Sequence, residues 1–390
     1  MGKQRAVAVI IFLLAIGLLA GGLCCLASRI ARFTFWIGRF GQGRAAFLYA
    51  LALILVLLTA LWLTMGYANA IVCFLHAAAI WLICDGAFRL LRRLGLGFAG
   101  HDAVGLAALA LTAAWLALGW HNAHSVRTTV YELRGNVTEP FRVVLFSDSH
   151  VGNLFSGSEL AAYVERMNAE KPDAVVIAGD FVDDETSSED MTAACAALKE
   201  LKTRCGVYFS FGNHDAGYYS SRRGYGREEL TDCLRANGVR VLEDETVLLT
   251  GNIRLCGRRD ARGGRKSAEE LCAVVEKGSY LIMADHCPTD YDAEAAAGAS
   301  LVLSGHTHGG QFIPIRSLIG RLGDNDRVYG HEKRGNTDFI VSSGLGDWAM
   351  DFRTGCFSEY VVIDILPDYN AIPPPRSARH LPLHKGGFGR

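Results

Sequence analysis

The chain has 390 residues, of which 50% are hydrophobic and 20% charged, and its net charge is −1. This length allows one sizeable domain and a further segment. The charge is uneven: residues 1–124 carry nine Lys or Arg against two acidic residues, whereas residues 125–390 carry 30 basic and 38 acidic residues. An acidic second part argues against nucleic acid as the main partner, because a phosphate backbone is bound by Lys and Arg.

Residues 1–124 are predicted to form an α-helical transmembrane region of about four spans. The apolar stretches are Ala6–Ala27, Ala45–Met65, Ala68–Cys84 and Ala103–Trp120, and a tight Gly66-Tyr67 turn joins the second to the third. A helix needs about 20 apolar residues to cross the hydrocarbon core of a bilayer. A cleaved signal peptide is the alternative for the first stretch, but that stretch is too long and three more follow. The lipid bilayer is therefore an expected partner.

The distribution of Lys and Arg indicates which side of the membrane each part of the chain faces. The connections after the first and third spans carry seven Arg, whereas the N-terminal tail carries only Lys3 and Arg5. Positively charged loops stay in the cytoplasm, so the acidic domain is expected on the extracytoplasmic side of the cell membrane. Two features favour the opposite side: Lys3 and Arg5 lie beside the first span, and the cysteines are scattered without a CxxC pair.

Residues 125–366 alternate short apolar runs of strand type with amphipathic helical stretches. The predicted strands are Thr129–Leu133, Arg142–Phe146, Ala174–Ile177, Val207–Phe211, Val239–Leu242, Val247–Leu249, Ile253–Cys256, Tyr280–Met283, Leu301–Leu303, Phe339–Val341 and Tyr360–Ile363. The predicted helices are Ser158–Glu170, Met191–Lys202, Arg227–Asn237 and Ala268–Glu276. Such alternation is typical of a layered α/β domain. Residues 367–390, with three consecutive prolines and scattered basic residues, are predicted to be a disordered tail.

Five polar motifs follow strand-type runs. In chain order they are Asp148-Ser-His150, Gly179-Asp180-Phe-Val-Asp183, Gly212-Asn213-His214-Asp215, an isolated His286, and Gly305-His306-Thr-His308. Each motif alone is weak, since a lone DxH or HxH is more often a turn or a surface pair. Together they offer carboxylates, imidazoles and one amide at strand ends, which predicts a centre for two divalent metal ions. Manganese, iron and zinc all suit these donors, and Cys287, beside His286, is interpreted as a packing residue.

The series DSH, GDFVD, GNHD, H and GHTHGGQ resembles the calcineurin-like metallophosphoesterase superfamily. The trailing Gln311 and the later Ser343–Gly346 segment resemble its membrane-associated bacterial branch, and the apolar front resembles transmembrane proteins with a metallophosphoesterase domain. The resemblance covers roughly residues 125–366. It implies a four-layer α/β fold, in which two packed β-sheets are flanked by helices.

The resemblance also implies a role for each motif residue. The first metal would be held by Asp148, His150 and His308, and the second by Asn213, His286 and His306, with Asp180 bridging the two. His214 would be the general acid, oriented by Asp215, and Asp183 would fix a ligand imidazole. Arg353, which follows the SGLG segment, is a candidate for binding the substrate phosphate.

These features predict a membrane-tethered, dinuclear-metal phosphoesterase that hydrolyses a phosphoester or pyrophosphate bond with metal-bound hydroxide. The tether favours a phosphorylated substrate that is lipid-linked or nucleotide-linked, and the resemblance makes UDP-2,3-diacylglucosamine one candidate. The apolar segment Phe312–Ile319 is expected either to reach lipid or to pack on the core. The alternative function is a non-catalytic, metal-binding sensor or scaffold in the membrane. The sequence does not indicate an oligomeric state.

Overall fold

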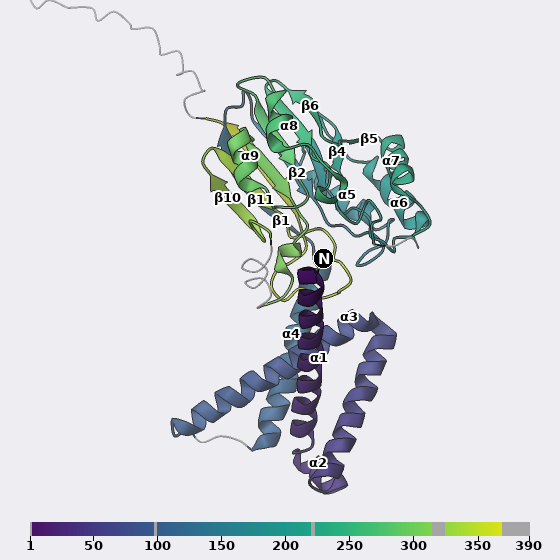
Figure 1. The fold of residues 1–390 in the computed structure, drawn as a ribbon, viewed down its shortest axis with the longest axis vertical. Helices are drawn as coiled ribbons and strands as arrows, with labels where there is room; N and C mark the ends of the chain where they lie inside the picture. The colour runs from purple at the N-terminus through teal and green to yellow at the C-terminus, as the bar shows by residue number, and fades with distance from the viewer. Residues whose placement is uncertain (1, 97–99, 220–222, 314–323, 369–390) are drawn as a thin grey trace, which may run out of the picture.

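A computed structural model describes residues 2–96, 100–219, 223–313 and 324–368. Figure 1 shows two parts, a set of long helices and, above it, a two-sheet domain. The helices are α1 (Gly2–Ile30), α2 (Thr34–Phe40), α3 (Arg44–Arg93) and α4 (His101–His124). The start of α1 lies next to the two-sheet domain, whereas α2 lies at the end of the helical part farthest from it (Figure 1).

Helix α3 is broken at Gly66 and contains both the second and the third predicted stretches. Gly66 has φ 81° and ψ 163°, a conformation that is essentially restricted to glycine. In Figure 1 the chain bends back sharply at this point, as the predicted Gly66-Tyr67 turn requires. Within the described ranges, two helices are long and apolar enough to cross a membrane, or three if the bent pair Ile16–Ile30 and Thr34–Phe40 forms one span. The number of about four spans stays a prediction.

The first sheet has six strands in the order β1-β12-β2-β3-β4-β5. Their bounds are β1 (Arg127–Gly135), β2 (Phe141–Phe146), β3 (Ala174–Ala178), β4 (Val207–Ser210), β5 (Val239–Val241) and β12 (Glu359–Pro367). Strands β2 to β5 run parallel, and β12 pairs antiparallel with β2.

The second sheet also has six strands, in the order β10-β11-β9-β8-β7-β6. Their bounds are β6 (Glu245–Thr250), β7 (Ile253–Gly257), β8 (Tyr280–Ala284), β9 (Leu301–Ser304), β10 (Gly330–Arg334) and β11 (Thr337–Val341). The four inner strands run parallel, while β6 and β10 pair antiparallel at the two edges.

The two sheets pack face to face, and helices cover their outer faces. In β2, Val143 and Leu145 enter the core between the sheets, while Val144 and Phe146 enter the core beneath the helices, because successive strand residues point to opposite faces. The covering helices are α5 (Leu160–Ala169), α6 (Ser188–Leu198) and α7 (Arg227–Ala236) on the first sheet, and α8 (Ala268–Ala273) and α9 (Tyr291–Ala297) on the second. The predicted four-layer α/β fold is confirmed.

Every predicted strand and helix of residues 125–366 has a counterpart in the structure. Strand β10 and helix α9 were not predicted. The β10 sequence GHEKR is polar and lacks an alternating apolar pattern, and α9 is short and rich in alanine. Of the predicted tail, Pro367 ends β12, and residues 369–390 lie outside the described residues.

The two-sheet domain contacts the helices directly. The Asn69 side chain of α3 donates to Asp351 Oδ2 at 3.0 Å, and the Asp351 N–H donates to Asn69 Oδ1 at 2.8 Å. The Arg353 N–H donates to the Gly119 carbonyl of α4 at 2.9 Å. A buried apolar cluster closes the same contact, formed by Val72, Phe312 and Phe352. Phe312 therefore packs between the two parts, and residues 314–319 of the predicted apolar segment lie outside the described ranges.

Candidate metal centre

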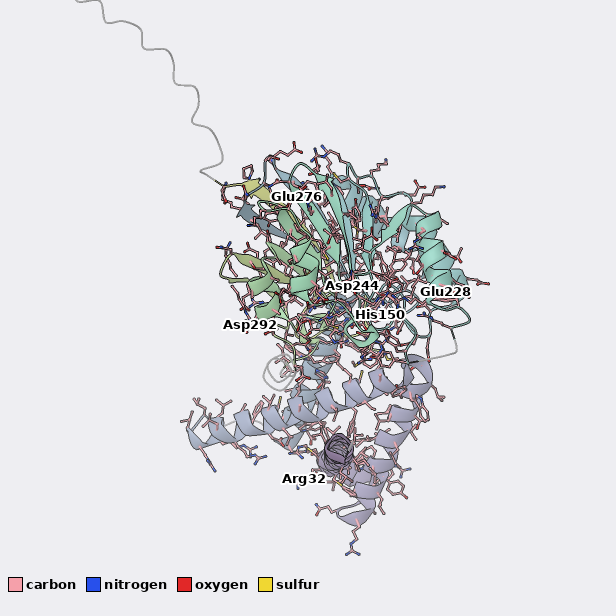
Figure 2. All side chains as sticks on the ribbon, turned by 45° about the horizontal axis from the view of Figure 1, so that its top comes forward. Arg32, His150, Glu228, Asp244, Glu276 and Asp292 are labelled. Carbon is pink, nitrogen blue, oxygen red and sulfur yellow. The ribbon has the colours of Figure 1, made fainter. Side chains whose placement is uncertain are left out.

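The predicted metal ligands follow the carboxyl ends of five strands. Strands β2, β3 and β4 of the first sheet lead to Asp148, Asp180 and Asn213, and strands β8 and β9 of the second lead to His286 and His306. Because the carboxyl ends of neighbouring parallel strands share one edge, the two sheets bring these residues together. In Figure 2, His150 marks this edge, on the side of the domain that faces the helices.

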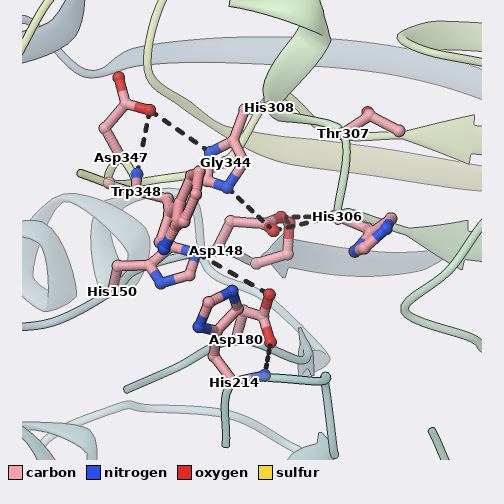
Figure 3. A network of polar contacts seen from close by, with 12 residues as sticks. Asp148, His150, Asp180, His214, His306, Thr307, His308, Gly344, Asp347 and Trp348 are labelled. Carbon is pink, nitrogen blue, oxygen red and sulfur yellow. Dashed lines mark hydrogen bonds and ion pairs between the residues drawn. The ribbon is translucent and has the colours of Figure 1, made fainter. Parts of the chain in front are cut away.

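Asp180 lies at the centre of the group. The ligand atoms of Asp148, His150 and His308 lie within 4.8 Å of one another, as do those of Asp148, Asp180 and His286. The Oδ2 atom of Asp180 lies 3.0 Å from His286 Nε2 and 3.8 Å from His150 Nε2. One carboxylate thus faces both predicted metal positions (Figure 3).

The remaining predicted ligands are those of the second position. The His306 and His286 rings lie with their centroids 5.1 Å apart. Asn213 Oδ1 and both ring nitrogens of His150 are buried and find no hydrogen-bond partner among the described residues. A buried polar atom without a partner is costly, and it calls for an unseen water or ion. The donor set and its unpartnered atoms therefore fit two divalent metal ions.

The backbone at these positions is unusual. Five predicted ligands have a positive φ, namely Asp148 (49°), His150 (40°), Asp180 (51°), His306 (72°) and His308 (47°). Residues other than glycine rarely adopt this conformation, and such residues cluster at functional sites. The motif glycines permit the close approach: a Cβ at Gly212 would collide with the Asp180 carboxylate, and one at Gly305 with that of Asp148.

Comparison with known proteins agrees with this geometry. Residues 141–310 match the sequence model of the family described as calcineurin-like phosphoesterase. An uncharacterized metallophosphoesterase of Aquifex aeolicus is 30% identical over 231 residues, which cover 57% of this chain and 84% of that protein. The chain belongs to the calcineurin-like phosphoesterase family.

Two further relatives show the range of the family. An uncharacterized metallophosphoesterase of Helicobacter pylori is 31% identical over 236 residues, covering 59% of this chain and 61% of the relative. A Danio rerio protein named transmembrane protein with metallophosphoesterase domain is 28% identical over 243 residues, covering 56% of this chain and 51% of the relative. The chain spans about three-fifths of the length of the Helicobacter pylori relative.

Burial and charge set the protonation states in the candidate site. Burial raises the pKa of Asp148. Burial acts in the same direction on Asp180, but the imidazoles of His286 and His150 outweigh it and hold the Asp180 pKa well below its usual range. Burial lowers the pKa of His306 to about 4 and that of His308 well below its ordinary value. Both imidazoles are therefore neutral at pH 7, which is the form that binds a metal.

His214 differs from these residues, because its ring faces two carboxylates. Its Nδ1 atom lies 2.6 Å from Asp184 Oδ2 and 3.0 Å from Asp183 Oδ1. Burial alone would lower the pKa of His214, but Asp183, Asp180 and Asp184 raise it to about 9. In the metal-free protein this imidazole is thus protonated at neutral pH, as a general acid must be before it donates a proton.

The structure corrects the predicted role of Asp215. Its buried carboxylate accepts four backbone N–H hydrogen bonds of 2.7–3.1 Å, from Asp180, Phe181, Val182 and Gly212. Asp215 therefore fixes the loop that carries Asp180, while Asp183 and Asp184 orient His214. Asp183 also lies 3.7 Å from His150 Nδ1, next to a ligand imidazole as predicted. The sequence signal for Asp184 was the second acidic residue of GDFVDD.

The structure also corrects Arg353 as a candidate for binding phosphate. Its side chain is fully buried, and Nε donates to Asp347 Oδ2 at 3.0 Å. Asp347 in turn lies 3.6 Å from His308 Nδ1. The pair of Arg353 and Asp347 therefore holds the imidazole of the predicted ligand His308 in place. Asp347 was not predicted.

Two aromatic rings flank His214 and were not predicted. The Tyr219 ring lies 5.0 Å and the Trp348 ring 5.9 Å from the His214 ring, centroid to centroid. Figure 3 shows Trp348 next to Asp347, whose carboxylate accepts from the Trp348 N–H at 3.1 Å. Cys287 lies close to His286 and His306, but burial raises the pKa of its thiol to about 12. A metal ion bound there would deprotonate the thiol, so the interpretation of Cys287 as a packing residue stays a prediction.

Proposed function

We propose that this chain is a membrane-tethered, dinuclear-metal phosphoesterase that hydrolyses a phosphoester or pyrophosphate bond. The observation that carries the proposal is the position of the Asp180 carboxylate, which faces imidazoles from both sheets. His150 and Asn213 also carry buried ring nitrogen and amide oxygen atoms without a hydrogen-bond partner among the described residues. The chain belongs to the calcineurin-like phosphoesterase family, and the site brings together carboxylates and imidazoles of the kind that hold divalent metal ions.

We assign the ligands as the motifs suggest. Asp148, His150 and His308 would hold one ion, Asn213, His286 and His306 would hold the other, and Asp180 would contact both. Manganese, iron or zinc ions held there would supply Lewis acidity and lower the pKa of a bound water. The Nδ1–H of His214 donates to the carboxylates of Asp184 and Asp183, which hold the ring in its protonated form. Its Nε2–H then faces the leaving oxygen. As a water oxygen bonds to phosphorus, the bond from phosphorus to the leaving oxygen breaks and that oxygen takes the Nε2 proton.

The helices support a site at the membrane surface. From Arg44 to Met65, helix α3 is about 33 Å long at 1.5 Å per residue, close to the ~30 Å hydrocarbon core of a bilayer. Gly66 then lies at the surface next to the two-sheet domain, and the Arg-rich α2 region lies at the opposite surface (Figure 1). Since basic loops stay in the cytoplasm, we infer that the phosphoesterase domain is extracytoplasmic.

A site at the membrane surface favours a lipid-linked or nucleotide-linked substrate of the UDP-2,3-diacylglucosamine type. The test uses the full chain in detergent with manganese, iron or zinc, and a panel of phosphomonoesters, phosphodiesters and pyrophosphates. We expect metal-dependent hydrolysis of at least one class, and its loss in Asp180→Asn. The matched control is Asp292→Asn, which makes the same change at an exposed carboxylate of α9. Wild-type protein that binds the metals but hydrolyses no member of the panel would contradict the proposal.

A further inference from the structure

Two cavities of the molecule meet at one residue of helix α3. We propose that the substrate is a lipid whose phosphorylated headgroup lies between the α3 break and the metal centre. Its hydrocarbon chain lies in an apolar groove between α1 and the two halves of α3. This inference rests on the proposed function and adds the part of the substrate that the helices bind.

The first cavity has a volume of about 370 Å³ and lies between the two parts of the molecule. Asp183, Asp184, Tyr219 and Trp348 line it on the side of the two-sheet domain, and Gly66 and Tyr67 line it on the side of the helices. Both acidic residues contact the His214 ring. A headgroup in this cavity therefore lies directly beside the proposed general acid.

The second cavity is a groove of about 260 Å³ within the helical part. Its lining comes from α1 and from both halves of α3, and includes Leu23, Leu55, Trp62, Tyr67, Ile71 and Phe74. Most of these side chains are apolar, and α3 is apolar enough to cross a membrane. The hydrocarbon core of a bilayer holds no water, so a hydrocarbon chain is the occupant that such a groove takes.

Tyr67 lines both cavities. It follows the break at Gly66, and its side chain is 68% exposed. Tyr is enriched where the hydrocarbon core meets the headgroup region, because its ring is apolar and its hydroxyl is polar. Tyr67 therefore lies where the apolar lining of one cavity gives way to the polar lining of the other. A lipid bound at both would place its hydrocarbon chain on one side of Tyr67 and its headgroup on the other.

The contacts between the two parts fix this passage. Asn69 lies two residues after Tyr67 and is hydrogen-bonded in both directions to Asp351. Trp348, which lines the headgroup cavity, lies three residues before Asp351. The same short segments therefore border the cavity and join the helices to the domain, so the cavity is held open next to the metal centre.

The test blocks the groove without touching the metal centre. Leu55→Trp and Ile71→Trp place a larger ring in the groove, and both native side chains are exposed, at 47% and 38%, so no buried packing is lost. The matched control is Leu57→Trp, at a 53% exposed residue outside the groove lining as described. Each full-length variant is assayed in detergent with p-nitrophenyl phosphate and bis(p-nitrophenyl) phosphate as chain-free substrates. Dioleoyl phosphatidic acid, dioleoyl phosphatidylethanolamine and undecaprenyl pyrophosphate serve as lipid substrates.

We expect both groove variants to lose at least tenfold in kcat/KM on the lipid that the wild type hydrolyses, and less than twofold on the chain-free esters. Leu57→Trp should match the wild type on both. An equal loss on both substrate classes, or no loss on the lipid, would overturn the inference, as would a wild type that hydrolyses only chain-free esters. Turnover of neither class would instead overturn the proposed function, and the inference with it.

Discussion

The two parts of the molecule bury their residues in different ways. In the two-sheet domain, inner strands such as β3 are buried at every position, and polar side chains gather at one edge. In the helical part, large apolar side chains remain exposed, as with Leu63 at 80%, which agrees with the proposed place of these helices in a membrane. The strands therefore fix the geometry of the candidate metal centre, whereas in our proposal the helices hold that centre at the membrane and bind the lipid chain.

This difference separates two classes of variant. A change among the strand-end residues should affect the hydrolysis of every substrate. A change in the helices or at their contact with the domain should affect stability or lipid substrates, and leave the hydrolysis of soluble esters intact.

The largest effect is expected at His214. Removing a general acid costs about 10²–10⁴ in rate, so His214→Ala should lower kcat to that extent on soluble esters. Because His214 is not an assigned ligand, the metal content measured by mass spectrometry should match the wild type. His121→Ala, at an exposed histidine of α4, is the control and should keep full activity. A loss of less than threefold in His214→Ala would contradict the assigned role.

A smaller effect is expected when Asp347 is replaced, whose Oδ1 atom lies 3.6 Å from His308 Nδ1. Partners of metal ligands typically contribute 10–100-fold in metal affinity, so Asp347→Asn should weaken metal binding by about that factor in a chelator competition. The control is Asp351→Asn, four residues further along, which lies at the contact with α3. Unchanged metal affinity in Asp347→Asn would show that the buried pair with Arg353 serves stability alone.

The contact between the two parts should affect stability and not chemistry. Asn69→Leu removes both hydrogen bonds to Asp351, and a buried or half-buried group left without its partner costs about 1–3 kcal/mol. Thermal unfolding in detergent should therefore begin at a lower temperature. The kcat/KM on p-nitrophenyl phosphate should stay within twofold of the wild type. Equal losses in stability and in soluble-ester hydrolysis would break the separation between the two parts.

The smallest effect is the pH dependence of stability in the metal-free protein. Burial lowers the pKa of His214, but Asp183, Asp180 and Asp184 outweigh burial and raise this pKa to about 9. The unfolded value is about 6.5. The ion pair therefore stabilises the fold fully below about pH 6.5, and this contribution is lost as the pH rises through about 9.

The measurement is chemical unfolding after chelation of the metals. The difference in unfolding free energy between wild type and His214→Gln should shrink between pH 6 and pH 10. A difference that stays constant over this window would contradict the charged pair.

The strands and the grouping of the candidate ligands were predictable, because the same sequence pattern marks both. Runs such as Ala174–Ile177 are continuously apolar, as parallel strands buried on both faces must be, and a polar motif begins where each run ends. Strand β10 and helix α9 lack such a signal, since GHEKR is polar and α9 is a short run rich in alanine.

The contacts made by the residues that surround the predicted ligands were less predictable. The family resemblance implied that Asp215 orients His214, but the carboxylate of Asp215 accepts from four backbone N–H groups. Arg353 was predicted as a candidate for binding the substrate phosphate, and its side chain is buried against Asp347. In both cases the sequence shows the residue type, while the direction of the side chain depends on loops that only the folded domain defines.

The most direct test of the metal centre is an anomalous-scattering crystal structure of the full chain grown with manganese. Our proposal predicts two ions per chain, roughly 3.5–4 Å apart as in other two-metal sites, with Asp180 coordinating both. A single ion, or two ions of which only one contacts Asp180, would contradict it.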